Sequence, residues 1–346
     1  MSRLCFLLLG ATGLLAAGCG DAGGDSPDGS GGAGSTGNLT TGSLTTGSMS
    51  TGSMSTGSMS TGSQSTGSGM PNIDNCTVFP SDNAWNADIS GLPTHPNSDG
   101  FVDWIGRDTH LHADFGDTFG IPYVVVPGTQ PKVPCNFDYA DESDPGPYPI
   151  PPDAPLEDGG DSHVLVIDGD ACVLYEMFAA STSNGGASWD AGSGAIWDLK
   201  TNSTRPAGWT SADAAGLPIF PGLARYDEAV TKGVIDHALR FTVSDSQAAY
   251  IAPASHYASN TTNPDAPPMG LRFRMKAGYD CSGYSQEAQV FCTAFKKYGL
   301  IVADNGSDWY ISGAPDPQWD NEALDDLKQI TGDAFEAVYT GDPVTD

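Results

Sequence analysis

Hydrophobic residues in this chain gather in short runs, which polar segments rich in proline and glycine separate from about residue 71 onward. Most of these runs are rich in β-branched and aromatic residues, a pattern typical of buried strands. Between two of the runs, Asp168-Gly169-Asp170 predicts a hairpin turn, because an Asp-Gly pair tolerates the positive φ angles of such turns. We expect strands over residues 121–126, 163–168, 172–178, 237–243, 271–277, 300–304 and 309–312.

Helical signals are fewer. We expect a helix over residues 285–298, because they begin with a serine that suits a helix N-cap and end with lysines shortly before Gly299. We expect a second helix over residues 321–330 and a short third helix over residues 223–231. Few helices and the lack of regular β–α alternation predict a mainly-β domain with a β-sandwich or jelly-roll-like core. The helix that runs directly into the strand at 300–304 keeps an α+β arrangement as the alternative.

The N-terminal residues have the pattern of an export signal. Arg3 gives a positive charge, and residues 4–17 are apolar but too few to span a bilayer as a helix. The sequence LAAGC at residues 15–19 resembles the lipobox of bacterial lipoproteins, in which the cysteine carries the lipid. The resemblance implies that residues 1–18 are a signal peptide, that Cys19 is lipidated, and that the exported protein is anchored to the bacterial envelope or cell surface. An ordinary secretory signal is the alternative.

Residues 19–70 cannot form a core of their own, because Gly, Ser and Thr dominate them. Glycine recurs at every fifth position from Gly42 to Gly67. Such a repeat is typical of a flexible, disordered linker. We therefore expect a single globular domain over residues 71–346, joined by this linker to the membrane anchor.

The charge of the chain limits its partners. The sequence has 14 basic and 43 acidic residues and a formal net charge of -29. Nucleic acids and anionic membrane surfaces attract basic patches, so this balance argues against both as partners. We expect a monomer whose contact with the membrane is its lipid anchor.

The cysteines predict two disulfides. Of the seven cysteines, Cys5 leaves with the signal peptide and Cys19 carries the lipid, which leaves five in the domain. An exported protein allows disulfides to form. We expect the pairs Cys281 with Cys292 and Cys76 with Cys135, and a free buried thiol at Cys172, which lies in an apolar run.

Motifs of several common enzyme classes are missing. The chain has no G-x-S-x-G, H-E-x-x-H, P-loop or C-x-x-C motif. His110 and His112 form an H-x-H pair, but their polar neighbours favour a surface loop over a metal site. Several carboxylates lie among prolines in residues 138–161, where we expect a solvated loop. We therefore expect no metal and no cofactor, with calcium as the one ion left open.

The segment over residues 205–256 differs from the rest of the chain in charge. Residues 200–276 contain eight basic and six acidic residues, whereas the chain as a whole is strongly acidic. Guanidinium groups suit carboxylate and sulfate ligands. The segment therefore indicates an extracellular anionic glycan as the ligand. Ion pairs within the protein are the alternative interpretation of the same residues.

As a polysaccharide lyase, the protein would take its catalytic groups from this segment. Arg205 or Arg225 would bind a uronate carboxylate, neutralise it and so make the adjacent C–H group acidic. His237 or His256 would accept that proton, and Tyr257 would protonate the leaving oxygen.

As a glycoside hydrolase, it would use a pair of carboxylates from Asp213, Asp227 and Glu228, one as acid and one as base or nucleophile. Trp197 and Trp209 would stack on sugar rings. The expected substrate-binding residues are Arg205, Trp209, Asp213 and Trp197. A non-catalytic carbohydrate-binding or adhesion module and a structural envelope protein are the alternatives to an enzyme.

Three segments resemble an uncharacterised family of secreted bacterial proteins. They are RPAGWTSADAAGLPI from Arg205, PGLARYDE from Pro221 and ADNGSDWYISGAPD from Ala303. The resemblance extends over most of the domain. It implies export, and it implies no particular activity.

Overall fold

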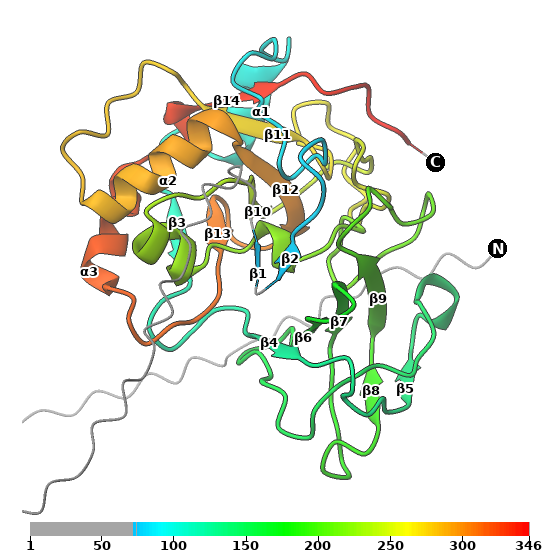
Figure 1. Ribbon diagram of the computed structural model, residues 1–346. Coiled ribbons are helices and arrows are strands. Elements are labelled where there is room, and N and C mark those ends of the chain that lie inside the picture. Colours follow the sequence, from blue (N-terminus) through cyan, green and yellow to red (C-terminus); the bar gives the residue numbers. More distant parts are fainter. Residues whose placement is uncertain (1–71, 74, 346) are drawn as a thin grey trace, which may run out of the picture. The chain divides into compact units, whose positions relative to one another are not determined.

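Strands dominate the described part of the chain, residues 72–73 and 75–345 of the computed structural model (Figure 1). The predicted mainly-β class with a few helices is therefore confirmed. The predicted signal peptide, the lipidated Cys19 and the linker lie outside the described residues. Within the described ranges, no helix combines the length and the apolar composition that a membrane span needs.

The larger of the two main sheets has six strands in the order β14-β11-β12-β10-β13-β3. Its neighbouring strands are antiparallel, except that β10 is parallel to β12 and β13 is parallel to β3. This mixed pairing differs from the antiparallel pairing of a jelly roll. The strands are β3 (His112–Asp114), β10 (Leu239–Val243), β11 (Arg272–Met275), β12 (Leu300–Asn305), β13 (Tyr310–Ser312) and β14 (Phe335–Val338).

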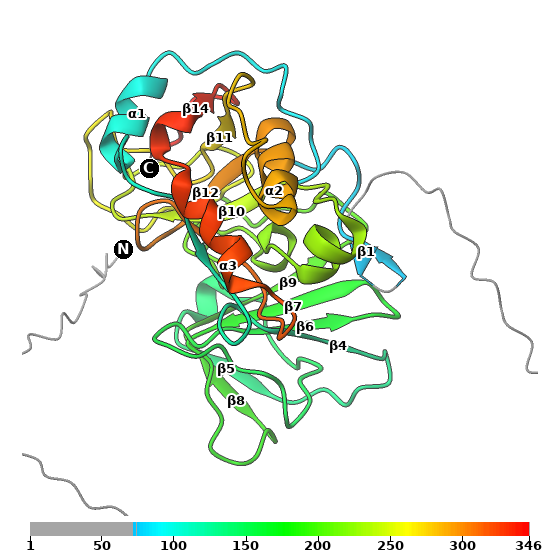
Figure 2. The same ribbon diagram turned by 90° about the vertical axis from the view of Figure 1, so that its left-hand side faces the viewer.

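The smaller main sheet has the order β4-β6-β7-β9 and lies below the larger sheet in Figures 1 and 2. All residues of β6 are buried, as the continuous apolar run that forms it predicts. Strands β6 and β7 form the predicted hairpin, whose turn is closed by a hydrogen bond from the Cys172 amide to the Asp168 carbonyl. The strands are β4 (Tyr123–Val126), β6 (Val164–Asp168), β7 (Val173–Phe178) and β9 (Ser193–Asp198), and two further pairs are β1 (Asn72–Ile73) with β2 (Cys76–Thr77) and β5 (Cys135–Phe137) with β8 (Trp189–Ala191).

The helices pack beside the larger sheet, α1 against β14 and α2 against β11. Ser285 caps α2 by accepting a hydrogen bond from the Ala288 amide, which confirms the predicted start of this helix. The helix predicted over residues 321–330 divides into α3 and the 3-10 helix η4, and the predicted third helix is the π-helix η3. The helices are α1 (Ser98–Ile105), α2 (Gln286–Lys297), α3 (Asn321–Leu324), η1 (Ala140–Glu142), η2 (Phe220–Gly222), η3 (Asp227–Lys232), η4 (Asp325–Gln329) and η5 (Gly332–Ala334).

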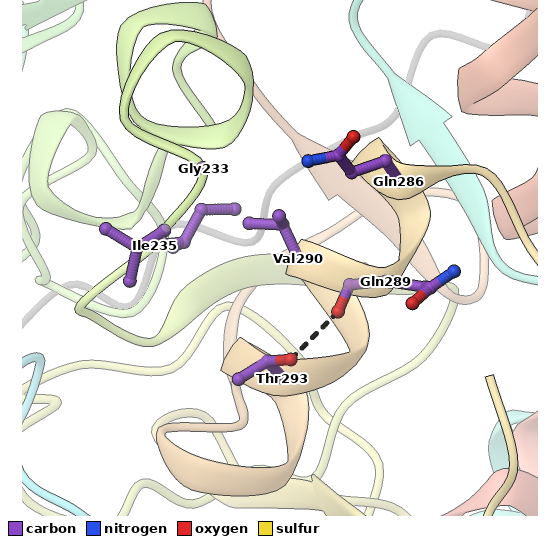
Figure 3. Close-up of a pocket in the computed structure, with 7 residues that line it drawn as sticks. Gly233, Ile235, Gln286, Gln289, Val290 and Thr293 are labelled. Atoms are coloured by element: carbon purple, nitrogen blue, oxygen red, sulfur yellow. Dashed lines mark hydrogen bonds between the residues drawn. The ribbon is translucent and has the colours of Figure 1, made fainter. Parts of the chain in front are cut away.

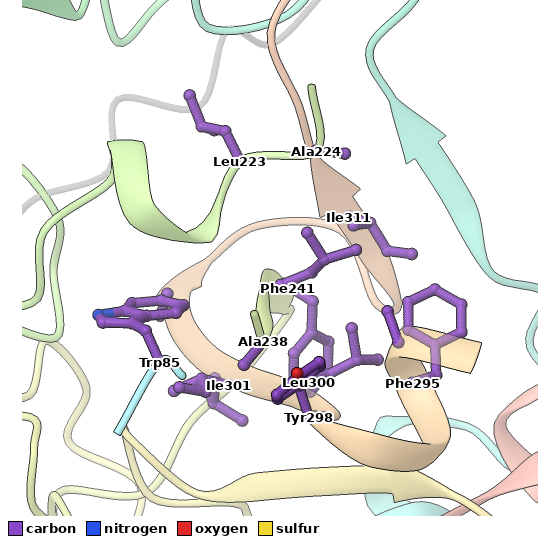
Figure 4. Close-up of a cluster of buried hydrophobic side chains, with 14 of the residues drawn as sticks. Trp85, Leu223, Ala224, Ala238, Phe241, Phe295, Tyr298, Leu300, Ile301 and Ile311 are labelled. Atoms are coloured by element: carbon purple, nitrogen blue, oxygen red, sulfur yellow. The ribbon is translucent and has the colours of Figure 1, made fainter. Parts of the chain in front are cut away.

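The main core lies where α2 packs on the larger sheet. Figure 4 shows Phe241 of β10, Leu300 of β12 and Phe295 of α2 among its side chains, and all three are fully buried. Phe241 also stacks on Trp309, with ring centroids 5.4 Å apart. Each such side chain contributes about 1.5–3 kcal/mol to folding by leaving water. This core fixes the strands that carry the polar cluster described below.

Side chains alternate along β10 between the core and the opposite face of the sheet. Phe241 lies in the core, so Arg240 and Thr242 project from the other face. The strand register pairs Thr242 with Asp304 of β12, just past a β-bulge. Charged residues of two central strands therefore gather on the face of the sheet opposite Phe241.

One predicted disulfide is confirmed and the other is wrong. Cys281 pairs with Cys292 as expected, but Cys76 pairs with Cys172 rather than with Cys135. Cys172 lies in the turn before β7, with a φ angle of 56°, rather than inside a strand, and so it can reach β2. Cys135 of β5 is the free cysteine of the described residues, and burial raises the pKa of its thiol to about 11. Such a thiol is a poor nucleophile at neutral pH.

Candidate functional site

Arg225 and His237, two of the predicted catalytic residues, meet at the buried carboxylate of Glu228. Arg225 Nη2 donates to Glu228 Oε1, and His237 Nε2 donates to Glu228 Oε2 over 3.0 Å. His237 Nδ1 donates to the carbonyl of Ala238 over 2.8 Å. Because both ring nitrogens face acceptors, both carry a hydrogen when both bonds form. We call Arg225, Glu228 and His237 the Glu228 cluster.

The Glu228 cluster is sealed from solvent, since none of its side chains is more than 3% exposed. Burial alone would raise the pKa of Glu228, but the charges of Arg225 and His237 lower it to about 2. The side chain of the neighbouring Asp227 is 44% exposed; it pairs with Lys232 at 2.8 Å, and its other carboxylate oxygen lies 3.9 Å from Arg225 Nε. The sealed cluster can stabilise the fold, but it gives a polysaccharide no access to Arg225 or His237.

The other predicted catalytic residues, His256 and Tyr257, lie elsewhere. The His256 Nδ1 atom bonds to the carbonyl of Ala214 at 2.7 Å. The rings of His256 and Tyr257 stack with centroids 6.1 Å apart, and Tyr257 also stacks on Tyr250. These contacts do not include the Glu228 cluster, so the predicted catalytic residues do not form one site.

Arg205 and Trp209, which we predicted to bind substrate, hold a loop in place. Arg205 pairs with the carboxylate of Asp144, donates to the carbonyl of Glu142 and donates over 2.9 Å to the carbonyl of Thr210. Its guanidinium lies over the Trp209 ring, 5.3 Å from the ring centroid. Arg205 thus connects the carboxylate-rich loop to the Trp209 segment, and its donors are already used within the protein.

Trp197, the other predicted stacking residue, is buried and donates from Nε1 to Glu176 over 3.1 Å. Glu176 also accepts hydrogen bonds from the backbone amides of Ile219 and Phe220. Burial raises the pKa of Glu176 to about 7, although these backbone donors oppose the rise. Trp197 is therefore an interior residue rather than an exposed platform.

Asp213, the remaining predicted substrate-binding residue, belongs to a second cluster that surrounds Arg240. Arg240 Nε and Nη2 donate to the two carboxylate oxygens of Asp213, over 3.2 and 2.8 Å. Arg240 Nη1 donates to Ser312 Oγ over 2.5 Å. Asp304 Oδ2 lies 3.7 Å from Arg240 Nη2. We call the following residues the Arg240 cluster: Glu157, His163, Asp213, Arg240, Asp304 and Ser312.

Asp304 opens the Arg240 cluster to solvent. It lies near the end of β12 beside the β-bulge, and its side chain is 24% exposed. Bulges are common next to active sites, where they redirect a side chain. Burial raises the pKa of Asp304, and the nearby carboxylate of Asp213 raises it further, to about 8. Asp304 is therefore a partly accessible carboxylic acid that keeps its proton at neutral pH.

Glu157 has the opposite protonation state. Its side chain is 17% exposed, and it accepts a hydrogen bond from His163 Nδ1 over 2.5 Å. Burial alone would raise the pKa of Glu157, but the hydrogen bond and the charge of His163 lower it below its ordinary value, and Arg240 lowers it further. Burial alone would lower the pKa of His163, but Glu157 raises it. Near Arg240, the cluster thus contains the protonated carboxyl group of Asp304, the ionised carboxyl group of Glu157 and the Asp213 carboxylate that pairs with Arg240.

A polar face of the larger sheet continues from Asp304 to the edge strand β3. The register places Thr242 opposite both Asp304 and Tyr310, and Tyr310 opposite His112. Residues that lie opposite each other on neighbouring strands share a face of the sheet. The rings of His112 and Tyr310 stack with centroids 4.2 Å apart and planes inclined by 9°. Asp114, the next polar residue of β3 on this face, is exposed at its edge.

Two pockets have linings that include no member of either cluster. One, of about 220 Å³, lies between residues 233–235 and α2, and Val290, Gln289 and Thr293 are among its lining residues (Figure 3). The other, of about 410 Å³, lies beside Pro127 and Asp170. Neither pocket combines a proton donor with a proton acceptor near neutral pH. The Arg240 cluster is therefore the better candidate for chemistry.

A metal site does not emerge from the described residues, because no group of three or more His, Cys, Asp or Glu side chains among them is arranged to hold an ion. The members of the H-x-H pair have different partners. His110 Nδ1 bonds to the carbonyl of Lys328 at 2.6 Å, whereas His112 stacks on Tyr310.

No protein-family model matches the chain, and no curated protein or solved structure is significantly similar to it. The function is therefore inferred from the chemistry of the Arg240 cluster.

Of the Arg240 cluster, only Asp213 is among the residues predicted to form the site. Arg240 and Asp304 do carry a sequence signal, because each is a charged residue within or at the end of an apolar run that predicts a strand. A charge in such a position needs a buried partner. Glu157 carries no such signal, and its pairing with His163 depends on how a loop folds back.

Proposed function

We propose that the protein is an extracellular glycoside hydrolase in which Asp304 is the general acid and Glu157 is the general base or nucleophile. The observation that carries this proposal is the opposite displacement of two carboxyl pKa values in one partly open cluster. Glycosidases use such a pair, one carboxyl group protonated and one ionised. Asp304 would protonate the leaving oxygen, and Glu157 would activate water or attack the sugar.

Arg240 has a supporting role in this proposal. Asp213 and Ser312 occupy its three donor nitrogens, so the guanidinium has one fixed position. Its charge favours the ionised form of Glu157, while the Asp213 carboxylate disfavours ionisation of Asp304. The Arg240–Asp213 pair therefore supports the difference between the two carboxyl groups without contacting substrate.

The charges of the site favour a neutral glycan over the anionic glycan that the sequence predicts. Glu157, Asp213 and Asp114 outnumber the cations Arg240 and His163, and the chain as a whole has a net charge of -29. Uronate or sulfate groups would meet repulsion at such a surface. Aromatic rings suit the apolar face of a neutral sugar. The stacked rings of His112 and Tyr310 lie on the same face of the sheet as Asp304, because Thr242 is paired with both Tyr310 and Asp304.

The proposal agrees with the predicted export and lipid anchor, because an enzyme at the cell surface would meet glycans outside the cell. The lyase hypothesis receives less support. It requires an arginine and a histidine that reach substrate, and Arg225 and His237 are sealed in the Glu228 cluster.

A panel of neutral and acidic polysaccharides tests the proposal. We expect the wild-type protein to release reducing ends from a neutral glycan, and we expect Asp304→Asn and Glu157→Gln each to abolish this release while remaining folded. The matched control is Asp227→Asn, which should retain activity because Asp227 is an exposed carboxylate outside the Arg240 cluster. Full activity in both cluster variants, or products with the absorbance of an unsaturated uronate, would overturn the proposal.

A non-catalytic carbohydrate-binding module is the second candidate, which the stacked pair His112 and Tyr310 favours. In that case, Tyr310→Ala would abolish glycan binding in a calorimetric titration, Asp304→Asn would leave binding unchanged, and no glycan of the panel would be cleaved. Cleavage of any glycan by the wild-type protein would exclude this candidate as the whole function.

A further inference from the structure

His163 lies at the centre of a hydrogen-bonded connection between Glu157 and the rest of the Arg240 cluster. The ring is buried, and its two nitrogens face two acceptors. Nδ1 donates to Glu157 Oε2 over 2.5 Å, and Nε2 donates to the carbonyl of Ala212 over 3.1 Å. Because a carboxylate and a carbonyl can only accept, both bonds form only when the ring carries both hydrogens.

The backbone strengthens the link between Glu157 and His163. The His163 amide donates to Glu157 Oε2 over 3.2 Å, and the Glu157 amide donates to the His163 carbonyl over 3.1 Å. Two donors of His163 therefore converge on one carboxylate oxygen. This arrangement leaves Oε1 of Glu157 without a bond to His163, so one oxygen is held while the other can face a reactant.

The other side of the His163 ring contacts the segment that carries Asp213. Ala212, whose carbonyl accepts from Nε2, directly precedes Asp213 in the chain, and Asp213 holds Arg240. Glu157 lies on the loop before β6 of the smaller sheet, whereas Arg240 lies on β10 of the larger sheet. His163 therefore connects Glu157 to the segment that holds Arg240 in place.

We propose that His163 is a positioning residue, which holds Glu157 through Nδ1 and fixes it relative to the Asp213–Arg240 pair through Nε2. This inference rests on the proposed role of Glu157 as base or nucleophile. His163 contacts no substrate and acts through Glu157 alone. The groups whose charges act on His163 are Glu157 and Asp161, which favour its protonated form, and Arg240, which opposes it.

The substitution His163→Gln tests this role, because glutamine keeps a donor but loses the charge. We expect kcat to fall about 100-fold, the cost typical of a catalytic group misplaced by about 1 Å, with little change in KM. We also expect the acidic limb of the pH–rate profile to move to higher pH, since Glu157 loses the partner that favours its ionised form. A purely structural role of His163 would lower the folded fraction and leave this limb in place.

The chain offers a matched control in His237→Gln. His237 also joins a carboxylate to a carbonyl through its two ring nitrogens, but in the sealed Glu228 cluster. Its substitution should lower stability without moving the pH–rate profile. An equal movement of the profile in both variants would overturn the inference.

A titration of the Glu157 carboxyl carbon by NMR separates this inference from the proposed function. In His163→Gln, the pKa of Glu157 should rise relative to the wild-type protein. An unchanged pKa of Glu157 in an active protein would overturn the role of His163 alone. A risen pKa in a protein that cleaves no glycan would overturn the proposed hydrolase and keep the control of Glu157 by His163.

Discussion

The Glu228 cluster and the Arg240 cluster contain the same kinds of groups. In each, an arginine pairs with a carboxylate, and a histidine joins a carboxylate to a backbone carbonyl. They differ in exposure and in charge balance. The Glu228 cluster is sealed and has one carboxylate for an arginine and a histidine, whereas the Arg240 cluster is open at Asp304 and has three carboxyl groups.

This difference explains why one cluster can only stabilise the fold while the other can perform chemistry. In the sealed cluster, the cationic partners hold the pKa of Glu228 at about 2, so its charge is constant over most of the pH range. In the open cluster, the third carboxyl group has no full cationic partner and keeps its proton. A proton held at neutral pH on a partly exposed group is what general acid catalysis needs.

The largest expected effect concerns activity and separates the two clusters most clearly. Asp304→Asn and Glu157→Gln should each lower kcat by about 10²–10⁴-fold, because each removes a proton-transfer group. Initial rates on the neutral glycan identified by the panel measure the effect. Substitution of Glu228 by Gln, at equal folded fraction, should leave kcat nearly unchanged, and a comparable loss there would contradict the distinction between the clusters.

The next largest effect concerns stability, and here we expect the Glu228 cluster to be more sensitive to substitution than the Arg240 cluster. Glu228→Gln should lower the free energy of unfolding by about 3–5 kcal/mol, because it leaves the buried charge of Arg225 and the buried ring of His237 without their carboxylate partner. Urea unfolding at neutral pH measures the change. A loss below about 1 kcal/mol would show that the sealed cluster is not a main source of stability.

The pH dependence of stability should also differ between the clusters. The folded pKa of Glu228 lies below its ordinary value of 4.5, so its contribution is complete above that pH and is lost as the pH falls toward about 2. The folded pKa of Asp304 lies above its ordinary value of 3.8, so the folded state loses stability as the pH rises from that value toward the raised pKa. Urea unfolding of the wild-type protein across this range should show both slopes, and Glu228→Gln should remove the acidic one.

A smaller effect follows for Asp304 itself. Asp304→Asn should raise the free energy of unfolding by about 1–2 kcal/mol at alkaline pH, because it removes a carboxyl group whose ionisation the fold opposes. The gain should shrink as the pH falls toward the ordinary pKa of an aspartic acid. A loss of stability at alkaline pH would instead indicate that Asp304 is an ionised partner of Arg240.

The smallest effect is expected at the surface. Asp227→Asn removes an exposed pairing with Lys232 and a longer contact with Arg225 Nε at 3.9 Å, and should change the free energy of unfolding by less than about 0.5 kcal/mol. Thermal unfolding of the wild-type protein and the variant measures it. A change above about 1 kcal/mol would show that Asp227 also supports Arg225 in the sealed cluster.

Local patterns in the sequence predict much of the secondary structure. The run VLVID becomes the buried strand β6, and the serine before residue 286 becomes the cap of α2, because both depend on neighbouring residues alone. The sequence does not predict the Cys76–Cys172 bond, because the apolar neighbours of Cys172 indicate a strand whereas Cys172 lies in a turn. The pairing of β10 with β12 in parallel likewise depends on contacts between distant residues.

The candidate site is harder to predict for the same reason. The charge of the segment over residues 205–256 singles out Arg225, His237 and Asp213, but it does not predict their partners, Glu228 and Arg240. The Arg240 cluster joins residues of the larger sheet to Glu157 and His163, which precede β6, and to Asp213. Only the fold decides that Asp304 is partly exposed while Glu228 is buried.

The infrared spectrum of the carboxyl groups tests the central claim most directly. A difference spectrum between the wild-type protein and Asp304→Asn at neutral pH should show the C=O band of a protonated carboxylic acid that the variant lacks. The same comparison for Glu157→Gln should show only the bands of an ionised carboxylate. A carboxylate signal from Asp304 at neutral pH would contradict its assignment as the acid of the Arg240 cluster.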